Sequence, residues 1–303
     1  MADEIILHHY DTSPFSEKPR VMFGIKRLAW RSVIQPVIMP KPELTPLTGG
    51  YRRIPVMQIG ADIYCDTQVI LAEIEARAPQ PKLVRAGDWA VNIWADRLFF
   101  QATVAVVFGA IGDNVPAAFI ADREKLSGRA FDMAAMKAAA LPMKAQWRAH
   151  AGWIEEGLQS EDFLGGSTPS LSDISAYMNV WWLSAAVRTA ADELLASFPR
   201  VAAWRGRMRA IGHGGRSDMT GAEALKIARE SEPAPGPDHD RADPLGMSPG
   251  ELVSVSADDY GRDAIAGRLV ALTPQRIVIA RDTEDLGRLH VHFPRVGYLI
   301  ARV

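Results

Sequence analysis

Short apolar runs alternate with helical patterns over the first eighty residues. A helical pattern separates the first two runs, and another, Val69-Ala76, follows the last. This βαβ-then-ββα order predicts a small four-stranded sheet with helices over residues 1–81. Pro79-Gln80-Pro81 ends the pattern as a short linker. The four runs with the composition of buried strands are Ile5-Leu7, Ser32-Ile38, Val56-Ile59 and Ile63-Tyr64.

From Asp88 to about Ala210, apolar residues recur at helical spacing and alanine is abundant. The turn Gly165-Gly166 precedes Ser170-Leu171-Ser172-Asp173, which has the pattern of a capping box. In such a box, the Ser170 hydroxyl accepts from the N3 amide and the Asp173 carboxylate accepts from the Ser170 amide. One more short helix is predicted over Ala222 to Glu230. We therefore expect an all-helical domain over residues 87–232.

The last segment changes character again. Residues 233–246 include Pro233-Ala234-Pro235-Gly236-Pro237 and have linker composition. Four or five short antiparallel strands are expected over residues 247–303, forming a small barrel or curled sheet. Such a module is marginal alone, so we expect it to pack on the helical domain or on a second subunit, with a structural or partner-directed role. The β-rich runs are Leu252-Val255, Ile265-Leu272, Arg276-Ala280 and Leu289-Val303.

Composition narrows the class of protein. The chain has 303 residues, enough for two or three domains, and a formal net charge of −2. This balance argues against a nucleic-acid binder, because no basic excess replaces phosphate counterions. The single cysteine, Cys65, excludes an intrachain disulfide and fits a reducing compartment. No run of eighteen apolar residues occurs, so no membrane span is expected and a cytoplasmic location is the default.

Three short motifs carry candidate chemistry. Ser13-Pro14 is a helix start, which directs a hydroxyl and free backbone N–H groups at one spot suited to an anion such as a thiolate. Ile54-Pro55 stands at the mouth of a strand, where a cis proline leaves backbone groups free for an extended peptide. Asp66-Thr67 ends the next strand and caps a helix. Together they predict a site for a thiol peptide.

In this order, the motifs resemble the thioredoxin-like domain of the glutathione S-transferase superfamily. Ser13-Pro14-Phe15-Ser16-Glu17-Lys18-Pro19-Arg20 is similar to its serine-type active-site helix, and Ile54-Pro55-Val56 to its cis-proline motif. The capping box at Ser170 and Phe198-Pro199-Arg200-Val201-Ala202-Ala203-Trp204 resemble its helical domain. The resemblance covers about 210 residues and implies a thioredoxin-like domain followed by an all-helical domain. The C-terminal β module lies outside it.

The resemblance implies glutathione as co-substrate and no metal. Ser13 would stabilise the thiolate. Ser16 is the alternative, because Pro19 would be tolerated in the first turn of a helix capped at Ser16. Ile54 and Pro55 would present backbone groups to the cysteinyl unit. Asp66 would bind the γ-glutamyl ammonium, Thr67 its carboxylate, and Arg53 is a candidate for the glycyl carboxylate.

Other residues favour structural roles. Cys65 should face the interior as a buried thiol, because it alternates with Asp66 on a strand. His290 and His292 share a strand face, but no third metal ligand is evident nearby. A few aromatic side chains could line a hydrophobic acceptor pocket at the domain boundary. They are drawn from Trp94, Phe99, Phe100, Phe108, Trp181 and Trp182.

The interpretation is a glutathione-dependent transferase that activates the thiol for attack on a small hydrophobic electrophile. Conjugation, dehalogenation, ether cleavage and isomerisation all lie within the family's range. A homodimer and a role in detoxification are expected from the resemblance. The alternative is a non-catalytic binding or regulatory protein that keeps the transferase fold and works through its C-terminal β module.

Overall fold

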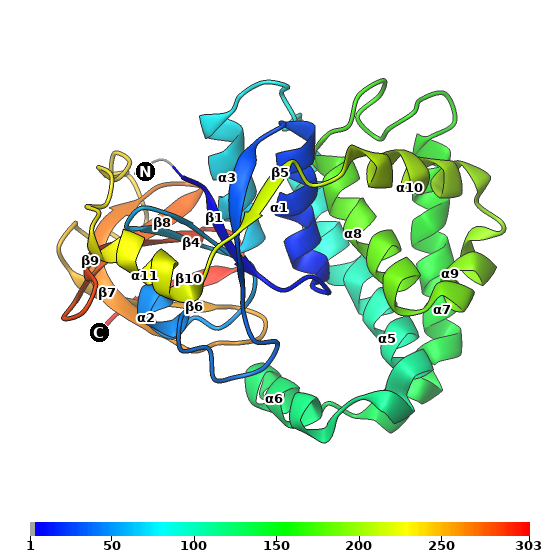
Figure 1. Cartoon of the computed structure of the whole chain (residues 1–303), viewed down its shortest axis with the longest axis horizontal. Coiled ribbons are helices and arrows are strands. Elements are labelled where there is room, and N and C mark those ends of the chain that lie inside the picture. The colour runs from blue at the N-terminus through cyan, green and yellow to red at the C-terminus, as the bar shows by residue number, and fades with distance from the viewer. Residues whose placement is uncertain (1–3) are drawn as a thin grey trace.

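A single ten-stranded sheet forms one part of the molecule, and most of the helices gather at one side of it (Figure 1). The computed structural model describes residues 4–303. The strand order in the sheet is β10-β6-β7-β8-β9-β4-β3-β1-β2-β5. Strands from the two ends of the chain therefore share one sheet.

The thioredoxin-like part has the predicted order. Strand β1 (Ile6–His9) pairs in parallel with β2 (Ala29–Ile34) and antiparallel with β3 (Val56–Ile59), which pairs with β4 (Asp62–Cys65). Strand β2 ends two residues before Pro36, four residues earlier than expected, because proline cannot donate to the ladder. The helices of this part are α1 (Pro14–Ile25), α2 (Thr45–Thr48) and α3 (Thr67–Arg77).

The predicted helical domain follows. Its first helix is continuous from Asp88 to Ile111, where α4 (Asp88–Trp94), the π-helical turn η1 (Ala95–Phe99) and α5 (Phe100–Ile111) join. This stretch is long and apolar enough to cross a membrane, but α4, η1 and α5 pack against α8, and α5 also packs against α7, as in a protein core. The remaining elements are η2 (Gly112–Asn114), α6 (Ala117–Ser127), α7 (Met133–Gly157), α8 (Leu171–Ala186), α9 (Arg188–Leu195) and α10 (Pro199–Ile211).

The predicted capping box at the start of α8 is present. The Asp173 carboxylate accepts from the Ser170 N–H at 2.8 Å, from the Leu164 N–H at 2.7 Å and from the Gly165 N–H at 2.9 Å. It also accepts from Trp204 Nε1 in α10 at 2.8 Å. One buried carboxylate thus ties the Gly-Gly turn, α8 and α10 together.

The C-terminal module continues the thioredoxin sheet. Its strand β9 pairs in parallel with β4, with Ile63 opposite Val291. We expected the module to pack on the helical domain. This prediction is wrong for its main contact, because the module pairs with the thioredoxin-like domain. Pairing satisfies the β4 backbone, which would otherwise be an exposed edge. The module consists of β6 (Leu252–Ala257), β7 (Ile265–Leu272), β8 (Arg276–Thr283), β9 (Gly287–Pro294) and β10 (Tyr298–Arg302).

Two segments between the helical domain and the C-terminal strands also contact the sheet. They are residues 215–229 and the expected linker, residues 233–246. Strand β5 (Gly215–Asp218) pairs in parallel with β2, and α11 (Gly221–Arg229) packs next to it. In the expected linker, the Ala234 N–H donates to Asp62 Oδ2 and the Asp240 N–H to the Leu272 carbonyl, both at 2.8 Å. The linker is therefore fixed to the body of the protein. The expected fold class, a thioredoxin-like domain, a helical domain and added C-terminal strands, is confirmed.

Candidate functional site

Ser13 caps α1 and faces a cavity. Its Oγ accepts a hydrogen bond from the Ser16 N–H at 3.2 Å, and its side chain lines the larger of two neighbouring cavities. The Ser16 hydroxyl is buried and has no hydrogen-bond partner within the described part of the chain. Pro19 lies inside the helix rather than in its first turn. Of the two candidate serines, Ser13 is thus the one that lines this cavity.

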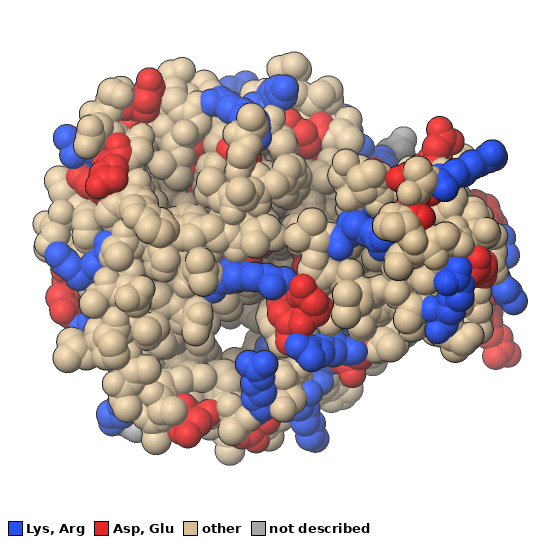
Figure 2. All heavy atoms as spheres, turned by 180° about the vertical axis from the view of Figure 1, so that it is seen from behind, with Lys and Arg blue, Asp and Glu red and all other residues tan. Residues whose placement is uncertain are grey.

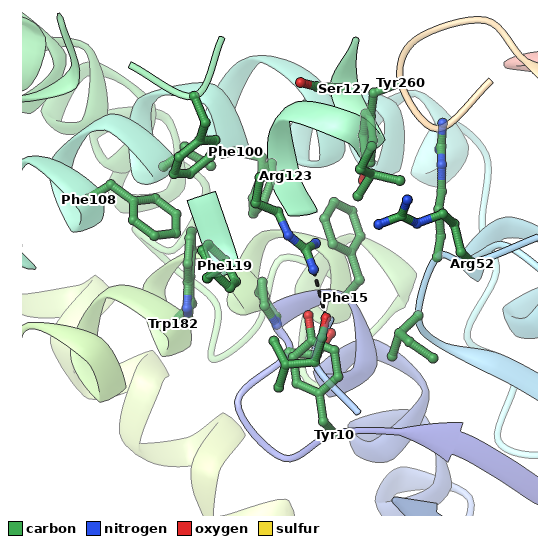
Figure 3. Close-up of a pocket in the computed structure, with 18 of the residues that line it drawn as sticks. Tyr10, Phe15, Arg52, Phe100, Phe108, Phe119, Arg123, Ser127, Trp182 and Tyr260 are labelled. Carbon is green, nitrogen blue, oxygen red and sulfur yellow. Dashed lines mark hydrogen bonds between the residues drawn. The ribbon is translucent and has the colours of Figure 1, made fainter. Parts of the chain in front are cut away.

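The larger cavity has a volume of about 250 Å³, and many aromatic rings line it (Figure 3). The Phe15 and Phe100 rings meet edge to face at 4.7 Å, and Phe100 stacks on Trp182 at 5.5 Å. An aromatic cavity is therefore present where the sequence predicted a hydrophobic pocket. The rings that line it are Phe15, Phe100, Phe108, Phe119, Phe131, Trp182, Tyr10 and Tyr260.

The other candidate aromatic residues lie elsewhere. Trp94 and Phe99 stack on each other at 5.3 Å in the helical core, next to His150. Trp181 lines two different cavities, one beside Arg209 and one beside Glu17. Of the six rings named from the sequence, Phe100, Phe108 and Trp182 therefore belong to the site.

A smaller cavity of about 60 Å³ adjoins the first, and both share Phe15, Arg53, Ile54 and Tyr260 as walls. Pro55, Asp66 and Thr67 line it, and the Ile54-Pro55 peptide bond is cis, as expected. Asp66 caps α3 by accepting from the Gln68 N–H at 2.9 Å, with a φ of 89°. The tertiary structure thus brings the Ile54, Asp66 and Thr67 motifs into one cavity beside Ser13.

A buried lysine, Lys18, forms a hydrogen bond with Thr67. Lys18 Nζ donates to Thr67 Oγ1 at 3.3 Å, to Asn92 Oδ1 at 2.6 Å and to Asp96 Oδ1 at 2.8 Å. Burial raises the pKa of Asp96, while Lys18 acts in the opposite direction. Because Lys18 uses an acceptor site of the Thr67 hydroxyl, the hydroxyl proton is free to point toward a ligand. Sequence reasoning missed both Lys18 and Asp96, since they lie 78 residues apart in the chain.

The C-terminal module supplies a wall of the smaller cavity. The Tyr298 hydroxyl donates to Asp66 Oδ2 at 3.1 Å and contacts the Tyr51 hydroxyl at 3.1 Å. Arg53 forms an ion pair with Asp259, and its guanidinium lies 4.0 Å from the centre of the Tyr260 ring. The candidate ligand for a glycyl carboxylate is therefore already paired. In the sequence, the β-rich runs predicted the C-terminal module, but no motif in the module predicted that its residues would line this cavity.

The remaining sequence candidates have structural surroundings. Cys65 is fully buried, and burial raises its pKa well above the ordinary value. His292 Nε2 lies 2.8 Å from Asp62 Oδ1 and its ring stacks on Tyr64, while His290 lies on the same face. Among residues 4–303, no group of three or more His, Cys, Asp or Glu side chains is arranged to hold a metal ion.

Comparison with known proteins agrees with this architecture. Residues 7–82 match the N-terminal domain of glutathione S-transferases, and residues 119–207 match their C-terminal domain. A GST-like protein from Pseudomonas syringae is 35% identical, with 100% of both chains covered and a TM-score of 0.83. A glutathione S-transferase from Rhodospirillum rubrum is 21% identical over 68% of this chain and 88% of its own, with a TM-score of 0.52.

One further relative is not named as a glutathione S-transferase. FtsZ-localized protein A of Caulobacter vibrioides is 30% identical over 186 residues, which are 58% of this chain and 75% of the relative. The two domain matches and the full-length similarity to the Pseudomonas protein lead to one conclusion. The chain belongs to the glutathione S-transferase superfamily.

Proposed function

We propose that the protein is a glutathione-dependent transferase in which Ser13 stabilises the thiolate of glutathione for attack on a small aromatic electrophile. The observation that carries the proposal is the position of Ser13, at a helix N-terminus and in the wall of an aromatic cavity. A free thiol has a pKa of about 8.5, and lowering this pKa to about 6.5 requires about 2.7 kcal/mol. A hydroxyl donor and a helix N-terminus together supply an effect of that order.

In the reaction, a lone pair of the thiolate sulfur forms the bond to the electrophilic carbon. In a displacement, the leaving group departs with the electron pair of its old bond. The aromatic cavity holds the electrophile beside Ser13 and excludes water, which strengthens the interaction of the hydroxyl with the anion. The family range of conjugation, dehalogenation, ether cleavage and isomerisation fits this arrangement.

The smaller cavity fits the γ-glutamyl end of glutathione. Its volume of about 60 Å³ is roughly four to six times the 10–15 Å³ that one water needs, which suits a compact amino-acid head group. Asp66 lines it and attracts an ammonium group, while the Thr67 hydroxyl donates to a carboxylate. Both Asp66 oxygens keep a lone pair beyond the bonds that Gln68 and Tyr298 use.

A second candidate is a binding protein that keeps the fold without transferase activity. Two observations favour it. Asp259 and Tyr260 of the C-terminal module already engage Arg53. One relative carries the name FtsZ-localized protein A, which describes a location rather than a reaction. In this case the C-terminal module acts as the interaction surface.

Thermal unfolding with and without glutathione separates the two functions, because a ligand that binds the native state raises its melting temperature. We expect a rise that grows with glutathione concentration. Ser13→Gly then tests the thiol: glycine is tolerated as a helix cap, so the variant loses the hydroxyl at little cost to the helix. The bound thiol should titrate at higher pH and turnover should fall at least tenfold.

Ser16→Ala is the matched control for this measurement. Its hydroxyl lies one turn away and is not part of either cavity wall, so the thiolate titration should stay unchanged. An unchanged melting temperature at saturating glutathione would reject the transferase and leave the binding protein. A shift caused by Ser16→Ala but not by Ser13→Gly would reverse the roles of the two serines.

A further inference from the structure

The wall of the larger cavity carries basic side chains and, among its described residues, no acidic one. Lys41, Arg52, Arg53 and Arg123 line it together with the aromatic rings. The molecule is hollowed between α6 and the rest of the chain, with basic and acidic side chains near the opening (Figure 2). This composition is unusual for a pocket that receives only neutral hydrophobic molecules.

The carboxylates behind the wall neutralise half of this charge. Asp122 forms ion pairs with both Arg52, at 2.5 Å, and Arg123, at 2.9 Å. Asp259 forms an ion pair with Arg53. Four cations against two carboxylates leave two positive charges at the cavity.

Lys41 is one of the cations at the cavity that lack a carboxylate partner of their own. Its side chain is buried, and its ammonium donates to the Pro36 carbonyl instead of to a carboxylate of its own. Burial and the neighbouring Arg123 lower the pKa of Lys41 to about 8, and Asp122 opposes this only in part. A cation without a full counterion in a partly desolvated site is unfavourable, and an anionic ligand would relieve that cost.

Arg123 is a cation that contacts one of the aromatic rings of the cavity wall. Its guanidinium lies 4.8 Å from the centre of the Phe119 ring, donates to the Val37 carbonyl at 2.7 Å and points toward Phe15 and Tyr10 (Figure 3). Its Nε is buried and has no hydrogen-bond partner within the described part of the chain. A planar fork with a free N–H suits a carboxylate.

We propose that the larger cavity binds an aromatic carboxylate, with the ring system among Phe100, Phe108 and Trp182 and the carboxylate on Arg123, Arg52 and Lys41. The identity of this ligand as the electrophilic substrate rests on the proposed function. Binding of the carboxylate does not, because the cationic and aromatic groups all belong to this chain.

Calorimetric titration with 2-naphthoate and its neutral isostere 2-naphthamide tests the proposal without glutathione. The acid should bind at least tenfold more tightly than the amide, and its affinity should fall with added salt. At pH 8, its binding should be accompanied by proton uptake, because the carboxylate raises the pKa of Lys41 from about 8. Equal affinity for acid and amide would overturn the proposal.

Three variants locate the contact. Arg123→Gln should weaken naphthoate binding at least tenfold and leave naphthamide unchanged, whereas Arg129→Gln, on the exposed surface, should change neither. Asp122→Asn keeps an oxygen to accept from the Met39 N–H but removes a negative charge, so it should tighten naphthoate binding severalfold. Weaker binding in folded Asp122→Asn, or no loss in Arg123→Gln, contradicts the assignment.

A competition measurement with glutathione completes the experiment. If glutathione competes with naphthoate and Arg123→Gln weakens both equally, the cations serve the tripeptide's own carboxylate, and this inference fails while the transferase proposal survives. If naphthoate binds as described and glutathione does not bind, the transferase proposal fails and the carboxylate site stands.

Discussion

The Tyr298 hydroxyl donates to Asp66 Oδ2 at 3.1 Å, across 232 residues of sequence. Tyr298 opens the last strand of the C-terminal module, and Asp66 caps the helix that follows the thioredoxin strands. Burial raises the pKa of Tyr298 well above its ordinary value, and the Asp66 carboxylate adds to the effect. Tyr298 is therefore a hydrogen-bond donor at all physiological pH values. The added module thus positions a residue of the candidate glutathione site.

Tyr298→Phe should weaken glutathione binding severalfold and lower the free energy of unfolding by about 1–2 kcal/mol, since a hydrogen bond to a charged group is lost. Tyr51→Phe is the matched control: its hydroxyl contacts that of Tyr298 but no carboxylate, so glutathione affinity should change less. Calorimetry and thermal unfolding give both quantities. Equal effects of the two variants on affinity would show that Tyr298 does not act through Asp66.

Removing the C-terminal module should expose the β4 edge. A chain truncated after Glu232 loses the β9–β4 ladder and uncovers the buried side chains of Ile63 and Cys65, so we expect aggregation or a much lower melting temperature. Deletion of Val303 alone is the control: its side chain is 73% exposed and only its N–H bond to the Leu252 carbonyl would be lost, so the effect should be small. A truncated chain that stays soluble and melts at the same temperature would make the module an independent appendage.

The two capping boxes should differ in their contribution to stability. Asp173→Ala leaves the Leu164, Gly165 and Ser170 amides and the Trp204 indole without their shared acceptor, so we expect a loss of about 3–5 kcal/mol. Glu223→Ala breaks the capping box at Thr220, where both side chains are exposed, and should cost about 1 kcal/mol. Denaturant unfolding measures both. Similar losses would mean that Asp173 acts as a simple helix cap.

Buried histidines should make the protein acid-sensitive. Burial lowers the pKa of His8 from 6.5 to about 4, opposed by its hydrogen bond with Gln58. Below pH 6.5 the unfolded chain takes up a proton that the folded chain does not, so stability falls as the pH drops from 6.5 to 4. The loss from His8 approaches about 3 kcal/mol at pH 4. His9, with its pKa lowered to about 3 by burial and by Arg20, adds to it.

Melting temperatures between pH 7.5 and pH 4.5 check this dependence, and His8→Gln supplies the comparison. Glutamine keeps hydrogen-bonding groups for Gln58 and Gln35 but does not titrate. The variant should lose stability less steeply on acidification than the natural chain. Identical slopes would place the acid sensitivity outside His8.

Local chemistry in the sequence determined much of the fold. Ser13 caps its helix and Asp173 completes its capping box because each acts on backbone groups within a few residues. The strand β7 was predicted with its observed bounds, since a run rich in Ile, Leu and Val between turn residues is readable in the sequence. The sequence could not show which of Ser13 and Ser16 lines a cavity, because that depends on how the surrounding helices pack against the two side chains.

Tertiary structure alone decided how the module and the site are assembled. The pairing of β9 with β4 depends on which sheet edge remains open after the thioredoxin strands have paired, and no local pattern encodes that. Lys41, Arg52 and Arg123 come from three separate segments, and each is an ordinary surface cation in the sequence. Only folding places them around one cavity with too few carboxylates, because net charge within a pocket depends on distances between segments rather than on composition.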